Sequence, residues 1–260
     1  MPSGSNSIGA EGNGSSTGAP AVVLEGVTKT FRIPKEHRTT LKENFVHLFR
    51  RVDYESFEAL SNIDMRVEYG DFFGVIGLNG SGKSTLLKIM ASIYEPDEGR
   101  CEVNGRVAPF LELGLGFNGE LTGRENVYLN GIIMGLTRRE VRSVYDEIVE
   151  FSEVGRFMEL KVKNYSSGML ARLGFAVSIH VPAEIMLLDE VLAVGDVEFQ
   201  QKCFSVFEDF SRQGRTIVFV THDLGSVERF CNKVVLLEGG RIEARGGAQE
   251  VIATYKARAV

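Results

Sequence analysis

The segment Gly77-Leu78-Asn79-Gly80-Ser81-Gly82-Lys83-Ser84-Thr85 constrains this chain more than any other part of its sequence. It fits the pattern GxxxxGK[ST], follows an apolar run and precedes a run with helical spacing. Backbone amides and the start of a helix give such a loop positive potential, whereas an isolated glycine-rich turn could simply cap a helix. We predict a phosphate-binding loop here (residues 77–85, the phosphate loop). Its phosphate-contacting residues would be Asn79, Gly80, Gly82, Lys83, Ser84 and Thr85, with the Ser84 hydroxyl also on Mg²⁺.

Two adjacent carboxylates, Asp189 and Glu190, follow the apolar run Ile185–Leu188. If that run is a strand beside the phosphate loop, Asp189 would reach the metal shell. Glu190 would then point toward the outermost phosphate and could polarise an attacking water. Taken alone, a strand ending in Asp-Glu is more often a solvated strand end. Its place about one hundred residues after a phosphate loop favours the catalytic interpretation.

Short apolar runs alternate with helical patterns along most of the chain, which predicts a parallel sheet with helices on both faces. A further strand-like run lies at 22–27. The expected buried strands are Phe72–Ile76, Ile185–Leu188, Thr216–Val220 and Val234–Leu237, and the expected helices are about 84–92, 138–152, 168–180, 198–213 and 224–231.

The composition of the chain limits its possible functions and cellular location. The chain has 260 residues and a net charge of −6, which gives no basic footprint for bulk nucleic-acid binding. Its three cysteines form no CxxC pair, which favours a reducing cytosol, and no apolar run is long enough for a membrane span. Residues 1–20 are rich in Gly and Ser, so we expect a disordered tail there.

A locally basic segment interrupts this acidic chain. Residues 35–52 carry Leu41, Phe45, Leu48, Phe49 and Val52 at helical spacing, and their Lys and Arg residues outnumber the two Glu residues. We predict a basic amphipathic helix. It could lie at an anionic membrane surface or pack its apolar stripe on its own domain.

The segment Asn164-Tyr165-Ser166-Ser167-Gly168-Met169 (residues 164–169, the signature segment) lies between the phosphate loop and Asp189. With these motifs, residues 21–260 resemble the ATP-binding subunit of an ABC transporter, whose LSGGQ signature this segment would replace. The resemblance implies an α/β fold of the P-loop NTPase, ABC type. This fold has a RecA-like parallel-sheet core, an antiparallel β subdomain and a helical subdomain at about 124–182. Ser166 and Gly168 would grip the γ-phosphate of ATP held by a second subunit; on its own the segment would be a helix N-cap.

The resemblance also assigns roles to four further residues. Asp196, in Ala193-Val194-Gly195-Asp196, would line the dimer interface, and His222, at a strand end, would sense the γ-phosphate and position Glu190 and water. Phe31 would stack on adenine, or be a core side chain. The family normally has a metal-contacting Gln where this chain reads Pro109-Phe110-Leu111-Glu112-Leu113. Glu112 is placed nearest that role, although Leu113 fits an ungapped spacing equally well.

Within the family, the chain is similar to ATPases that export lipid-linked polysaccharides such as O-antigen, teichoic acid, capsule or galactan. The similarity is carried by LELGLGFNGELTGRENVYLNGIIMGL, YSSGM, EVLAVGD and the basic insertion at 35–52. It implies a homodimer that binds and hydrolyses ATP with Mg²⁺ and binds no nucleic acid. Two copies of an integral-membrane permease would hold it at the cytoplasmic face of the membrane and carry the lipid-linked glycan.

Three alternatives remain for comparison. A GTPase would need a guanine-reading NKxD, whereas Asn232-Lys233-Val234-Val235 lacks the Asp. A DNA-repair ATPase of this head fold would separate its motifs by long heptads, which are absent here. The third is an ABC subunit that exports another cargo, such as lipid or drug. Some polysaccharide exporters carry a C-terminal glycan-binding domain, and the sequence up to Val260 leads us to expect none in this chain.

Overall fold

The computed structural model describes residues 18–34, 54–110, 116–189 and 195–258. The predicted basic helix at 35–52 lies outside these ranges, as does the predicted N-terminal tail apart from residues 18–20. Within the described ranges, no helix combines the length and the apolar content needed to cross a bilayer.

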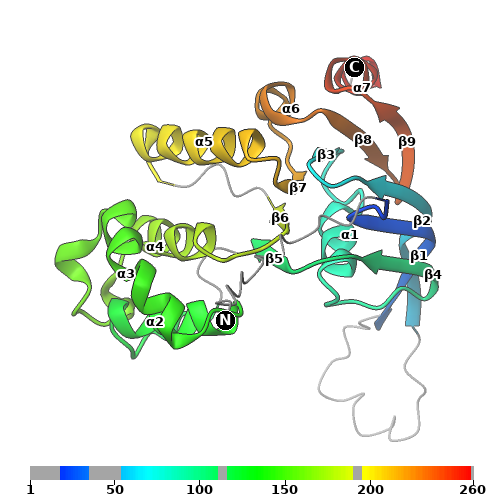
Figure 1. The fold of residues 1–260 in the computed structure, drawn as a ribbon. Helices are drawn as coiled ribbons and strands as arrows, with labels where there is room; N and C mark the ends of the chain where they lie inside the picture. Colours follow the sequence, from blue (N-terminus) through cyan, green and yellow to red (C-terminus); the bar gives the residue numbers. More distant parts are fainter. Residues whose placement is uncertain (1–17, 35–53, 111–115, 190–194, 259–260) are drawn as a thin grey trace, which may run out of the picture.

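A six-stranded sheet forms the centre of the molecule, in the order β5-β6-β7-β3-β8-β9 (Figure 1). All neighbouring strands are parallel except β8 and β9, which form an antiparallel pair. The buried apolar runs found in the sequence are its central strands, because strands covered on both faces need apolar side chains at every position. The strands are β3 (Phe72–Ile76), β5 (Val107–Phe110), β6 (Ile185–Asp189), β7 (Thr216–Val220), β8 (Lys233–Glu238) and β9 (Arg241–Gly246).

Alternate side chains of this sheet enter two separate apolar cores, so both of its faces are covered. On β3, Phe72 and Ile76 belong to a core with the helices that follow β6, whereas Phe73 and Val75 belong to a core with α1 (Lys83–Met90). The two-residue alternation of a strand produces this division. The helices on the first face are α5 (Val197–Arg212), α6 (Leu224–Phe230) and α7 (Ala248–Arg258).

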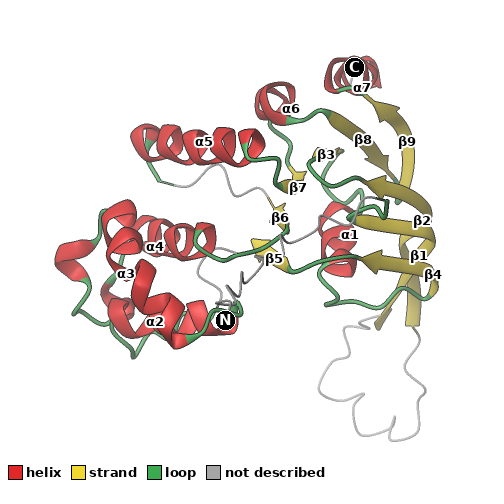
Figure 2. Cartoon of the chain, viewed as in Figure 1, coloured by secondary structure: helices red, strands yellow, loops and turns green. Residues whose placement is uncertain are grey.

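A second, antiparallel sheet of three strands covers the far side of α1, in the order β2-β1-β4 (Figures 1 and 2). Its strands are β1 (Val22–Pro34), β2 (Tyr54–Val67) and β4 (Glu98–Val103). The strand expected at 22–27 therefore continues to Pro34, because β2 pairs with β1 along this whole length. This sheet corresponds to the antiparallel β subdomain implied by the family resemblance.

Three helices, α2 (Gly123–Ile133), α3 (Arg138–Ser152) and α4 (Ser167–Ile179), pack together beside the main sheet, drawn in green in Figure 1. Two short 3-10 turns, Gly155–Phe157 and Val162–Asn164, connect α3 to α4. Both α2 and α3 begin with a capping box, in which a Thr side chain accepts from the amide of a Glu three residues later and that Glu accepts in return. These boxes fix the two helix starts and so position the segment that leads into α4.

Candidate functional site

The phosphate loop joins the buried end of β3 to the start of α1. Gly82 caps the helix with a φ of 105°, and the Leu86 amide donates to its carbonyl at 2.9 Å. The Lys83 side chain is 6% exposed and folds back over the loop, where Nζ donates to the carbonyl oxygens of Gly77 at 2.8 Å and Leu78 at 3.0 Å. The ammonium is thus held at the loop's centre, where it can contact phosphate.

Close packing explains why glycine stands at two positions of this loop. A Cβ on Gly82 would lie 2.5 Å from the Ala59 carbonyl oxygen of β2, and a Cβ on Gly77 would lie 2.1 Å from the Leu237 carbonyl oxygen of β8. Within the loop, the buried hydroxyl of Ser81 has no hydrogen-bond partner in the described part of the chain. The loop is therefore shaped by backbone contacts from both sheets and keeps one unused hydrogen-bonding group.

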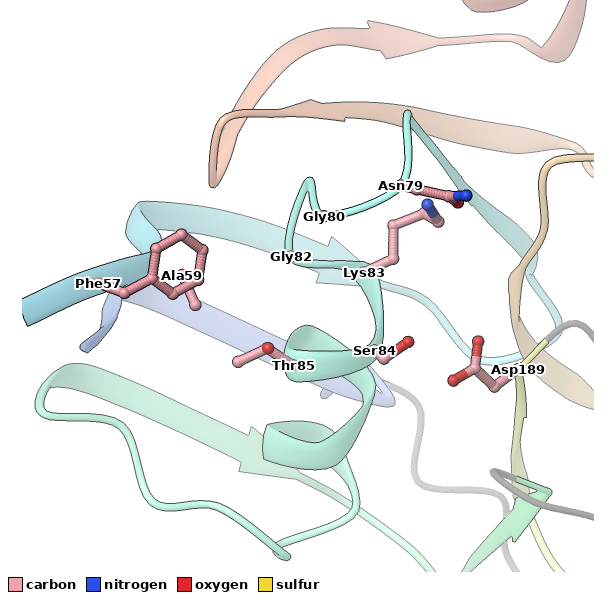
Figure 3. Close-up of a pocket in the computed structure, with 9 residues that line it drawn as sticks. All are labelled: Phe57, Ala59, Asn79, Gly80, Gly82, Lys83, Ser84, Thr85 and Asp189. Atoms are coloured by element: carbon pink, nitrogen blue, oxygen red, sulfur yellow. The ribbon is translucent and has the colours of Figure 1, made fainter. Parts of the chain in front are cut away.

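A pocket of about 520 Å³ opens over the phosphate loop. In Figure 3 the Ser84 hydroxyl and the Asp189 carboxylate point toward one another from α1 and from the end of β6. A hydroxyl and a carboxylate are oxygen donors of the kind that Mg²⁺ prefers. The lining residues are Phe57, Ala59, Asn79, Gly80, Gly82, Lys83, Ser84, Thr85 and Asp189. Sequence reasoning did not identify Phe57 and Ala59 as part of this site.

His222 lies at the same edge of the sheet as Asp189. In the parallel β6–β7 pair Asp189 is opposite Val220, and His222 follows Val220 after one buried residue. The exposed His222 is held in a fixed turn, because the Asp223 amide donates to Thr221 Oγ1 at 3.0 Å and the Asp223 carboxylate caps α6. His222 is not among the residues that line the pocket.

The signature segment begins α4. The Ser166 side chain accepts from the Met169 amide at 3.2 Å, which makes it the N-cap of the helix. Tyr165 is 8% exposed and donates its hydroxyl to the Phe157 carbonyl at 2.8 Å, which anchors the turn. Ser166 and Ser167 are exposed and Gly168 is half-buried, so the start of α4 lies at the surface.

A second pocket of about 550 Å³ opens over the signature segment. Asp196 lines it and caps α5, with Oδ1 accepting from the Phe199 amide at 3.0 Å. That amide, followed by the Arg172 guanidinium, holds the pKa of Asp196 below its usual range. The lining residues are Glu153, Val154, Phe157, Ser166, Ser167, Gly168, Met169, Ala171, Arg172, Gly195 and Asp196.

The two pockets share no lining residue. Asn79, Gly80, Gly82, Lys83, Ser84, Thr85 and Asp189 are brought together in the first, and Ser166, Gly168 and Asp196 in the second. Within one copy, the phosphate loop and the signature segment therefore line separate pockets.

Three predicted site residues are not assigned to either pocket. Phe31 is half-buried, and its ring meets the edge of Tyr94 with 5.4 Å between ring centres; it does not line the first pocket. Glu112 and Glu190 lie outside the described residues. Arg172 and Glu153, which line the second pocket, were not identified from the sequence.

Comparison with known proteins agrees with this arrangement. The profile of the family described as "ABC transporter" matches residues 60–193. The O-antigen export system ATP-binding protein RfbB of Klebsiella pneumoniae is 42% identical, over 91% of this chain and 98% of the relative. The protein of the same name from Myxococcus xanthus is 46% identical, but this chain spans only 55% of its length.

More distant matches extend the comparison. The teichoic acids export ATP-binding protein TagH of Bacillus anthracis is 40% identical over 90% of this chain and 42% of the relative. Among solved structures, the dimeric post-hydrolysis state of the ATP-binding cassette MJ0796 bound to ADP and Pi has a TM-score of 0.70 at 23% identity. The match covers 87% of this chain and 98% of the solved chain, and it shows that the two chains share a fold. The chain belongs to the ABC transporter family.

Proposed function

We propose that this chain binds and hydrolyses ATP as the nucleotide-binding subunit of an ABC transporter that exports a lipid-linked polysaccharide. The observation that carries the ATPase assignment is the first pocket, where Lys83, Ser84 and Asp189 converge on the phosphate loop. The names of the similar proteins, O-antigen export and teichoic acid export, support the cargo class.

In the proposed mechanism, amides of the phosphate loop and Lys83 bind the nucleotide phosphates. The Ser84 hydroxyl and the Asp189 carboxylate would hold Mg²⁺, which when bound neutralises phosphate charge. Glu190 would polarise the attacking water and His222 would sense the γ-phosphate from the neighbouring strand end. Glu112 would complete the metal-side contacts.

Two copies of the chain would act together. The separation of the two pockets supports a head-to-tail homodimer, in which Ser166 and Gly168 of one copy contact ATP on the phosphate loop of the other. Asp196 would lie at that interface. Since the closed dimer adds γ-phosphate contacts that the open one lacks, ATP would favour closure and hydrolysis would favour reopening.

The dimer would drive a separate integral-membrane permease, in two copies, from the cytoplasmic face of the membrane. Residues 35–52, predicted as a basic amphipathic helix, would lie at the membrane interface beside that permease. The second candidate cargo is a lipid or drug, since the nucleotide pockets alone do not select between cargoes.

The ATPase proposal is tested with Glu190→Gln. We expect ATP binding to remain and turnover to stop, so that a closed dimer accumulates with ATP and is seen by size-exclusion chromatography. Lys83→Ala is the matched control, because it should lose ATP binding and therefore form no such dimer. Normal turnover by Glu190→Gln would show that Glu190 is not a catalytic residue.

The cargo proposal is tested by depleting the protein in its host and analysing lipid extracts. A lipid-linked glycan should accumulate in the cytoplasmic leaflet, and re-expression of the intact chain, but not of Glu190→Gln, should clear it. Accumulation of a lipid or drug with unchanged glycan would support the second candidate cargo instead.

A further inference from the structure

The guanidinium of Arg172 joins three separate elements of the fold. From the second turn of α4, Nη2 donates to Asp196 Oδ2 at 2.7 Å, at the start of α5, and Nη1 donates to a carboxylate oxygen of Glu153, at the end of α3. Its central carbon also lies 4.7 Å from the ring centre of Phe199. The guanidinium is planar and forked, and two carboxylates and an aromatic face contact it. These contacts together fix its orientation.

This arginine is mostly covered, unlike its partners. Its side chain is 17% exposed, compared with 46% for Glu153 and 65% for Asp196. Lys202 of α5 also binds Glu153 at 3.2 Å, so the charges of this group balance. Exposed ion pairs usually contribute little to stability, because solvent screens them and their side chains must be ordered. A covered guanidinium that packs on an aromatic ring is screened less and loses less conformational entropy when it binds.

The Arg172–Asp196 ion pair is part of the wall of the second pocket. Both residues line it together with Ser166 and Gly168. Asp196 is also the N-cap of α5, so one arm of its carboxylate is bonded to its own helix and the other to α4. A side chain on the neighbouring Gly195 would be crowded, because its Cβ would lie 3.1 Å from the Phe199 side chain.

Charge gives the arginine a second effect. Without Arg172, the carboxylates of Glu153 and Asp196 would face the same pocket as the signature segment, and like charges disfavour the approach of a phosphate. Arg172 offsets that repulsion while holding Asp196 in place. One side chain therefore sets both the shape and the charge of the surface next to Ser166.

We propose that Arg172 is a positioning residue that holds Asp196 and the signature segment together as one rigid surface, which receives the nucleotide bound by a second copy of the chain. The inference rests on the proposed function, because it assumes that the second pocket meets the partner's ATP. Arg172 acts on closure of the dimer and on turnover, and has no part in nucleotide binding by a single copy.

The test compares Arg172→Ala with Asp196→Asn, in which Asn retains the helix cap but loses the charge that binds Arg172. Binding of a fluorescent ATP analogue to the monomer should be unchanged in both. ATP-driven dimer formation in the Glu190→Gln background, and kcat in the native background, should each fall about tenfold, the cost of one lost hydrogen bond to a charged group. The double variant should be no worse than Arg172→Ala alone, because that substitution already removes the Arg172–Asp196 contact.

Arg124→Ala is the matched control. Arg124 also binds a carboxylate, Glu159 at 2.7 Å, and lies 5.0 Å from the ring centre of Tyr145, but it does not line the second pocket. It should leave dimer formation and kcat unchanged. Arg172→Lys keeps the positive charge but not the forked guanidinium, so it should recover part of the lost dimer formation and kcat. A merely structural role of Arg172 would lower the melting temperature without these differences between variants.

The outcomes separate the two proposals. If the unmodified chain neither binds nor hydrolyses ATP, the proposed function itself is wrong. If it does both, and Arg172→Ala or Asp196→Asn dimerises and turns over normally, the positioning role is overturned. Additive losses in the double variant would also overturn it. Should Arg172→Ala fail to fold, Asp196→Asn decides the question alone.

Discussion

Phe57 lies directly opposite Phe31 in the pairing of β1 with β2, and it is Phe57 that lines the pocket over the phosphate loop. Paired residues on antiparallel strands share one face of the sheet, so the two rings face the same side. Phe57 is 49% exposed, whereas Phe31 is half-buried against Tyr94. The aromatic side chain that lines the pocket is therefore the cross-strand partner of Phe31, the residue that the family resemblance suggests.

We expect Phe57→Ala to weaken ATP binding about tenfold, because stacking of a base on an aromatic ring contributes roughly 1–3 kcal/mol. Phe31→Ala should have a smaller effect on binding and a larger one on the melting temperature, since its ring packs on Tyr94. Titration of each variant with a fluorescent ATP analogue and with the triphosphate group alone would measure the base contribution. A larger binding loss in Phe31→Ala would return the stacking role to Phe31.

Gly82→Ala should abolish nucleotide binding. Its Cβ would lie 2.5 Å from the Ala59 carbonyl oxygen, and neither backbone can shift without moving β2 or the loop. Gly80→Ala is the comparison: its φ of 80° is also strained for alanine, but no atom lies within 4 Å of the added carbon. Calorimetric titration with ATP should therefore show a partial loss for Gly80→Ala. Equal affinities of the two variants would contradict the crowding argument.

Asp71 is expected to be important for stability and not for activity. It is 5% exposed, and its carboxylate accepts from the Glu68 amide at 2.9 Å, Asn232 Nδ2 at 3.1 Å and Lys233 Nζ at 2.9 Å. Asp71→Ala should lower the free energy of unfolding by about 2–3 kcal/mol, because it removes three part-buried hydrogen bonds to one buried carboxylate. The exposed Asp146→Ala should change it by no more than about 0.5 kcal/mol. Chemical denaturation at low nucleotide concentration would measure both.

The cysteines make stability depend on alkaline pH. Burial raises the pKa of Cys101 from 9.0 to about 11, and the pKa values of Cys203 and Cys231 to about 12. Because the thiols of the unfolded chain lose their protons first, stability is complete below pH 9 and falls as the pH rises from about 9 toward 12. Native protein at pH 8 should react with iodoacetamide far more slowly than unfolded protein. Rapid labelling of the native chain at pH 8 would contradict this.

The central strands and most helices follow from the sequence because their signals are local. The apolar run Phe72–Ile76 and the amphipathic pattern of Arg138–Ser152 match β3 and α3 as the structure has them. The helix Gly123–Ile133 was not predicted, although Thr122 and Glu125 form a capping box that marks its start. The buried face of this helix contains Asn and Gly residues as well as apolar ones. Its apolar side chains therefore do not recur with a clear helical period.

The site residues likewise include some that a local sequence pattern identifies and some that it does not. The phosphate loop is one contiguous pattern, so sequence alone identifies Lys83 and Ser84. Phe57 reaches the pocket only through the register of β2, and Arg172 reaches Asp196 only through the packing of α4 on α5. These contacts join residues that lie far apart along the chain, and no local pattern encodes them.

The separation of the two pockets has a consequence for mixtures of variants. In the proposed two-fold symmetric homodimer, each complete ATP site would take Lys83 from one copy and Ser166 from the other. A pair formed from one Lys83→Ala copy and one Ser166→Ala copy would concentrate both defects in a single site and leave the opposite site intact. Two inactive proteins, once mixed, would therefore restore half of the active sites in every hybrid pair.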